Sequence, residues 1–423
     1  MNQFFSSYGD LLIIVATVVG FFMAWGIGAN DVANAMGTSV GAKALTIKQA
    51  ILVAMLFEFA GAYLAGGEVT STIRKGILDV SYLSDSPELF VLGMISALFA
   101  AAIWLLLAST FGWPVSTTHS IIGAVVGFAA VGISVDAVNW QIVIGIAGSW
   151  IITPIIAGCI SYAIFISTQK LIFYTDRPIT NAKRYLPWYM LAGGLVISLV
   201  TFEKGLQHLG LEMNHIEAFI YSMIVAVFIT AIGIFFINRL KISDQGDIRS
   251  QISSVEQVFA ILMIATACSM AFAHGSNDVA NAIGPLAAVV SVVKSGGVIA
   301  KTSALAWWIL PLGGLGIIAG LAIMGRRVIA TIGKGITNLT PSRGFAAELS
   351  AATTVVIASG AGLPISTTQT LVGAVLGVGM ARGIAAINLA VVRNILISWV
   401  VTLPIAALIS ILCFYLLKFM LLQ

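Results

Sequence analysis

Long apolar stretches dominate this chain, and polar residues gather in short segments between them. Residues 218–237 carry no charged side chain, and residues 185–202 hold none either. A helix needs about 20 mostly apolar residues to cross a bilayer, whereas the strands of a membrane barrel alternate between apolar and polar positions. The pattern therefore predicts membrane-spanning α-helices and argues against a β-barrel.

Composition extends this interpretation to the whole chain. Of its 423 residues, 59% are apolar and 9% are charged, where a soluble domain has about 25% charged residues. The mean hydropathy is +1.03. These values exclude a soluble enzyme, a disordered protein, a coiled coil and a nucleic-acid-binding protein. The length allows about a dozen spans, so we expect an all-α polytopic membrane protein with about 12 helical segments.

Two sequence motifs occur twice, in the same order. Residues 28–37 read GANDVANAMG and residues 275–284 read GSNDVANAIG, while residues 114–127 read PVSTTHSIIGAVVG and residues 364–377 read PISTTQTLVGAVLG. The second motif begins 83 residues after Asp31 in one copy and 86 residues after Asp278 in the other. Internal duplication is common in secondary transporters. We divide the chain into a first repeat, connecting spans and loops, and a second repeat, at residues 1–170, 171–253 and 254–423.

The distribution of basic residues predicts the orientation. Lys and Arg concentrate in the loops 170–184 and 239–249, which two apolar segments separate. Two spans return the chain to one side, and basic loops stay in the cytoplasm. The second repeat then starts inside, whereas no Lys or Arg precedes the first apolar stretch, which favours an N-terminus outside. We therefore expect inverted-topology repeats in the cell (inner) membrane.

The first motif places carboxylates and amides at apparent bilayer depth. Asp31 and Asp278 directly follow long apolar stretches, where a buried acid costs about 2.5–3.5 kcal/mol. An Asn three residues after each Asp faces the same side of a helix, and flanking glycines would let the helix unwind and free backbone carbonyls. Oxygen ligands of this kind suit Na⁺ better than zinc or copper. Small residues could merely allow close helix packing, but that explains the glycines and not the polar residues. The aspartates are expected to coordinate a cation or to carry a proton, and the expected ligands for Na⁺ or a similar ion are Asn30, Asp31, Asn34, Asn277, Asp278 and Asn281.

The second motif favours anion binding. Proline suits the first turn of a helix, and the free N–H groups of a helix N-terminus attract anions. Gly112, Gly360 and Gly362 predict a break before each helix, as in a broken or re-entrant hairpin. Two such ends meeting from opposite sides could surround a tetrahedral oxyanion, with plain helix capping as the alternative. The expected oxyanion ligands are Ser116, Thr117, Thr118, Ser366, Thr367 and Thr368, with Asp31 or Asp278 accepting from a protonated oxyanion.

Other polar residues carry weaker signals. Glu58 and Glu348 lie within further apolar stretches. His119 and His274 lack a partner at metal-ligand spacing, which favours a packing or hydrogen-bonding role. No nucleotide-binding or hydrolase motif is present, so the sequence indicates neither an enzyme nor a requirement for an organic cofactor.

The paired motifs GANDVANA/GSNDVANA and PVSTTH/PISTTQ resemble those of the inorganic phosphate transporter (PiT) family, cation-coupled phosphate symporters in which Na⁺ or H⁺ drives phosphate uptake. The resemblance covers essentially the whole chain and implies a homodimer. Carried over by motif, the Asp and Asn residues help bind sodium, the Ser and Thr residues hold phosphate, and Glu58 and Glu348 match glutamates needed for transport. Gln369 stands where relatives often have His, and the short loop 238–254 favours a microbial type.

We therefore expect a Na⁺-coupled phosphate symporter that works by alternating access. The motifs contain no Lys or Arg, so bound Na⁺ would supply the positive charge that lets anion and cation bind together. Proton coupling, a sulfate permease and an anion channel are the alternatives.

Overall fold

The computed structural model describes residues 3–422 with several gaps. The gaps are at residues 114, 212, 241–246, 300–304, 327–328, 330–338 and 384–387. The description also omits the side chains of residues 3, 33, 34, 75, 80, 389, 391 and 394.

Within the described residues, every extended regular element is a helix. The first half contains α1 (Gln3–Asn30), α2 (Val32–Gly41), α3 (Ile47–Ala65), α4 (Gly67–Lys75), α5 (Pro87–Phe111), α6 (Thr117–Gly132) and α7 (Trp140–Thr168). The middle contains α8 (Pro178–Glu203) and α9 (His215–Arg239). The second half contains α10 (Ile248–Lys294), α11 (Ile309–Gly320), α13 (Pro341–Gly360), α14 (Thr367–Ala381) and α15 (Leu389–Leu421). Short 3₁₀ and π turns lie at Val80–Tyr82, Val135–Ala137, Gln169–Phe173, Gly205–Leu209 and Leu321–Gly325.

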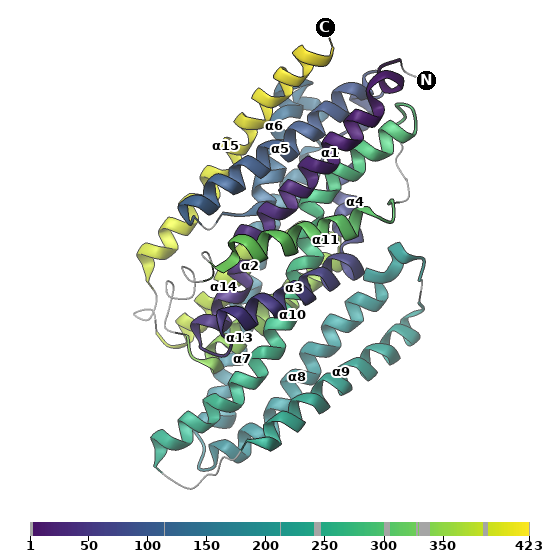
Figure 1. Ribbon diagram of the computed structural model, residues 1–423. Coiled ribbons are helices and arrows are strands. Elements are labelled where there is room, and N and C mark those ends of the chain that lie inside the picture. Colours follow the sequence, from purple (N-terminus) through teal and green to yellow (C-terminus); the bar gives the residue numbers. More distant parts are fainter. Residues whose placement is uncertain are drawn as a thin grey trace.

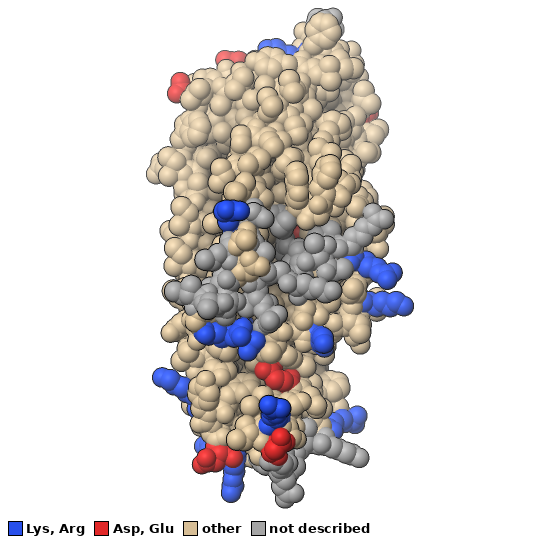
Figure 2. Space-filling model, turned by 90° about the vertical axis from the view of Figure 1, so that its left-hand side faces the viewer, with Lys and Arg blue, Asp and Glu red and all other residues tan. Residues whose placement is uncertain are grey.

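The helices have the length and apolar character of a multi-pass membrane protein. Eight helices in the described part are long and apolar enough to cross a membrane. Figure 2 shows one face whose upper part is almost free of charge below its rim, while Lys and Arg gather lower down. This architecture confirms the predicted all-α polytopic fold, and the helix count agrees with the expected 12 or so segments.

Two helical hairpins carry the duplicated PxSTT motifs, as predicted. One hairpin joins α5 to α6 and the other joins α13 to α14, and we call them the first and second hairpins. Gly112 and Gly362 both have φ = +68° where the chain turns, a conformation that glycine adopts without strain. The helices α6 and α14 have 16 and 15 residues, fewer than the roughly 20 of a full span.

The two copies of the first motif lie on helices that run in opposite directions. Figure 1 shows α1 descending from the N-terminus at the top, while α10 rises from the bottom of the view. The chain turns at Asp31 between α1 and α2, but α10 remains helical over all 47 residues through Asp278. The expected unwinding of the second copy is therefore wrong.

Close packing explains the motif glycines instead. A Cβ on Gly28 would lie 1.9 Å from the carbonyl oxygen of Ile317 in α11, and a Cβ on Gly275 would lie 2.2 Å from that of Glu58 in α3. Each glycine thus lets two helix backbones touch, which is the packing role that small residues have in membrane helices.

Candidate ion-binding site

The starts of α6 and α14 meet in the interior of the protein. The hydroxyls of Ser116 and Ser366 accept hydrogen bonds from the N–H groups of the residues three positions on, at 3.2 and 3.3 Å. These serines therefore cap their helices, as sequence reasoning allowed. The hydroxyl of Thr118 donates to the carbonyl oxygen of Ile365 at 2.8 Å, so the first hairpin directly contacts the loop of the second.

Both motif aspartates accept hydrogen bonds from threonine hydroxyl groups of both hairpins. Asp31 accepts from Thr117 at 2.8 Å and also from Thr368. Asp278 Oδ2 accepts from Thr117 at 3.1 Å and from Thr367 at 3.0 Å. Thr117 has one hydroxyl hydrogen, so it can serve only one carboxylate at a time. Both aspartates are buried, and Asp278 Oδ1 has no hydrogen-bond partner among the described residues.

Asn30 and Asn277 tie the motif helices to the hairpins in the same way. Asn30 Nδ2 donates to Ser109 Oγ at 3.1 Å and to the carbonyl of Trp113 at 3.2 Å. Asn277 Nδ2 donates to Ser359 Oγ and to the carbonyl of Leu363, both at 3.0 Å. A backbone carbonyl only accepts, so these contacts fix which end of each amide is the NH₂ group.

The amide oxygens of these asparagines are buried acceptors. Asn30 Oδ1, Asn277 Oδ1 and Asn281 Oδ1 have no hydrogen-bond partner among the described residues. The NH₂ group of Asn281 is occupied, because it donates to Thr117 and Thr118 at 3.2 and 3.1 Å. A buried acceptor without a partner is costly, and a hard cation would satisfy it. These oxygens therefore fit the predicted sodium ligands, whereas the side chain of Asn34 lies outside the described residues.

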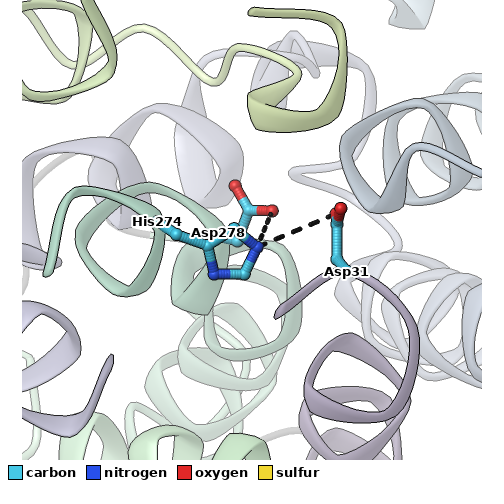
Figure 3. A group of neighbouring side chains, drawn as sticks. All are labelled: Asp31, His274 and Asp278. Atoms are coloured by element: carbon cyan, nitrogen blue, oxygen red, sulfur yellow. Dashed lines mark ion pairs between the residues drawn. The ribbon is translucent and has the colours of Figure 1, made fainter. Parts of the chain in front are cut away.

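His274 is the residue of this centre that sequence analysis undervalued. Figure 3 shows its ring from α10 pointing between Asp278 and Asp31, with Nε2 at 3.2 Å from one carboxylate and 4.0 Å from the other. Its Nδ1 lies 2.8 Å from Glu58 Oε2 on α3. The expected hydrogen-bonding role is present at Nδ1, and the contacts of Nε2 with the two carboxylates place the ring between Glu58 and both motif aspartates. Its position four residues before Asp278, one helical turn away, was the available signal.

Glu348 lies in a separate cluster. It accepts from the hydroxyls of Thr38 at 2.5 Å, Ser39, and Thr266 at 2.8 Å. These donors come from α2 and α10, so Glu348 on α13 joins three helices. The two glutamates therefore have different surroundings: Glu58 contacts the aspartate centre through His274, and Glu348 is surrounded by hydroxyl groups.

A family model describes this chain over most of its length. The model of the phosphate transporter family matches residues 27–410. The chain belongs to the phosphate transporter family. The chain is 56% identical over 419 residues to a Haemophilus influenzae protein named as a phosphate permease. The match covers 98% of this chain and 99% of that protein.

Two further relatives of this phosphate transporter are a plant protein and a protein with a solved structure. The Arabidopsis thaliana protein named inorganic phosphate transporter 2-1, chloroplastic, is 41% identical over 428 residues, covering 94% of this chain and 70% of that protein. A solved structure described as the sodium-dependent phosphate transporter is 40% identical, with a TM-score of 0.90, over 97% of this chain and 99% of that one. These relatives are transporters, and the centre described above lies within the matched region.

The contact between α10 and α3 gives a first prediction for this phosphate transporter. In Gly275→Ala the added methyl group would meet the Glu58 backbone, so we expect a loss of about 1–3 kcal/mol of stability from overpacking. Gly145→Ala in α7 is the control, because a Cβ there meets nothing within 4 Å among the described residues and alanine favours a helix by about 0.5–1 kcal/mol. Thermal unfolding in detergent measures the stability of both variants. Equal melting temperatures would contradict the packing argument.

Proposed function

We propose that this phosphate transporter is a Na⁺-coupled symporter that moves phosphate across the cell (inner) membrane by alternating access. The observation that supports it best is the chemistry of the buried centre. Hydroxyl donors and the N-termini of two helices face two aspartates, and amide oxygens that have no partner among the described residues lie on the same motifs. Such a centre offers donors to an anion and oxygen ligands to a cation.

The charges of the centre explain why a cation is needed. Asp31, Asp278 and Glu58 are three buried carboxylates, and His274 contacts all of them. If the ring is protonated and the acids are ionised, the group still carries two excess negative charges. Phosphate is an anion as well, so it would be repelled at short range in a medium of low dielectric constant. Bound Na⁺ removes this repulsion, and the two substrates then bind cooperatively.

We propose a role for each group of residues in this centre. The Ser and Thr residues at the two helix starts hold phosphate through hydroxyl and backbone N–H groups, and Asp31 and Asp278 accept from its protonated oxygens. The same aspartates, with the asparagine amide oxygens, bind sodium. In the predicted orientation the loops 170–184 and 239–249 are cytoplasmic and the N-terminus is outside.

Uptake of labelled phosphate into proteoliposomes tests the coupling ion. We expect uptake with an inward Na⁺ gradient and none with an inward H⁺ gradient alone. Excess unlabelled phosphate should compete, whereas sulfate should not, because dianionic sulfate has no proton to donate to Asp31 or Asp278. Uptake driven by H⁺ alone would refute sodium coupling and reassign the acids as proton carriers. Conductance without saturable, cation-dependent uptake would point to a channel instead.

A further inference from the structure

The tip of the second hairpin is held between two elements outside the hairpin. On one side, Thr72 Oγ1 in α4 donates to the carbonyl oxygen of Gly362 at 2.6 Å. On the other side the tip packs against α8, where a Cβ on Gly360 would lie 2.5 Å from Val200 Cγ1 and 3.9 Å from Lys204 Cβ. A single side-chain hydroxyl thus joins α4 to the loop that precedes the anion-binding start of α14.

A narrow cleft lies beside this tip, and its lining includes a hydrogen-bond partner of Asn277. Its walls come from the ends of α3, α4 and α8 together with α10 and α13, and the exposed Lys204 and half-buried Glu68 are among its lining residues. Ser276 and Ser359 also line it. Ser359 Oγ accepts directly from Asn277 Nδ2 at 3.0 Å. One hydrogen bond therefore separates the cleft from a residue whose amide oxygen has no described partner.

The cleft is too small for phosphate as it stands. It has room for about one water molecule. An ion with several oxygens could pass only if the hairpin tip moved away from α8 or α4. The first hairpin differs, because a Cβ on Gly112, the counterpart of Gly362, meets nothing within 4 Å among the described residues.

We propose that this cleft is the access path from the aqueous phase to the Asn277 side of the centre, closed in this structure, and that Thr72 is the latch that holds the second hairpin shut. The proposal rests on the proposed function, since it takes the surroundings of Asn277 as an ion site. Thr72 contacts no substrate in this role. It is a positioning residue that acts through the backbone of Gly362.

Single cysteines test the path. Cys159, Cys268 and Cys413 are first replaced by alanine, and Thr201→Cys is introduced on the cleft wall of α8. The matched control is Leu199→Cys, also half-buried but about 200° around the same helix. Proteoliposomes are treated with membrane-impermeant, cationic methanethiosulfonate reagents of increasing size. We expect modification of Thr201→Cys to abolish Na⁺-driven phosphate uptake, with larger reagents more effective, and Leu199→Cys to keep its uptake.

Thr72→Val tests the latch, because it removes the hydroxyl and keeps the shape. The lost hydrogen bond should raise the rate at which Thr201→Cys is modified by about 2-fold to about 10-fold, and Thr72→Ser should restore the slow rate. Modification at Thr201→Cys without loss of uptake, or no reaction in either background, would overturn the path. An unchanged rate in Thr72→Val would overturn the latch.

A failure here is distinguishable from a failure of the proposed function. Asp278→Asn is measured in the same cysteine-free background without any reagent. If that variant still shows Na⁺-dependent uptake, the ion site is assigned wrongly. If it loses uptake while modified Thr201→Cys keeps it, the ion site stands and the access path is wrong.

Discussion

Asp278→Asn should abolish Na⁺-dependent phosphate uptake while leaving the protein folded. Asparagine matches aspartate in shape, and its amide oxygen can still accept from Thr117 and Thr367. The negative charge is gone, however, and with it the strongest ligand for a cation beside His274. Losing one partner of a buried charge pair costs about 2–5 kcal/mol. This cost corresponds to a fall of at least about 30-fold in Na⁺-dependent phosphate uptake. Initial rates of uptake at saturating phosphate and varied Na⁺ measure this effect.

A matched control separates the site from a general effect of removing an acid. Asp136→Asn makes the same chemical change at an exposed position in the turn Val135–Ala137, and we expect it to keep normal uptake. Elution as a single species in detergent and an unchanged melting temperature would show that Asp278→Asn is folded. Uptake at the normal rate and with normal sodium dependence in Asp278→Asn would refute the role of this carboxylate.

The sequence predicted the architecture because two strong signals agreed. Charge-free stretches long enough to cross a bilayer gave the membrane-spanning helices, and the repeated motifs marked corresponding positions in the two halves. The breaks before α6 and α14 were also predictable, since glycines and a proline interrupt apolar runs there. The unbroken course of α10 through its motif was not predictable, because the same glycines that permit unwinding also permit close contact with Glu58 of α3. Only the tertiary neighbour decides between these two uses of glycine.

The candidate site was predictable where residues repeat and hidden where they do not. Asp31, Asp278 and the threonines recur in both copies, and the structure brings them into direct contact. His274 has no counterpart in the first copy, where Ile27 stands directly before the motif, so duplication did not mark it. Glu58 and Glu348 stand out in the sequence as acids within apolar stretches. The residues that they contact, however, come from helices far away in the sequence. Periodicity along one chain cannot show such contacts.

The second large effect is expected from the pair formed by Glu58 and His274. In Glu58→Ala the ring loses the carboxylate that lies 2.8 Å from Nδ1, and both side chains of this contact are buried. Breaking a buried charged pair in this way costs about 3–5 kcal/mol. We also expect phosphate uptake to be lost, because the contact at Nδ1 that orients Nε2 toward Asp278 and Asp31 is removed. Glu58→Gln keeps an acceptor for Nδ1–H and should retain most of the stability, which thermal unfolding in detergent can measure.

A double-mutant cycle shows whether Glu58 acts through His274 or merely by being buried. If the contact matters, Glu58→Gln and His274→Gln should be non-additive by about 0.5–3 kcal/mol in the free energy of unfolding. Glu348→Gln supplies the control, since Glu348 is equally buried but is held by hydroxyl groups from α2 and α10. Its effect should add to that of His274→Gln within about 0.5 kcal/mol. Additive effects in both cycles would mean that Glu58 does not position the ring and acts merely as a buried group.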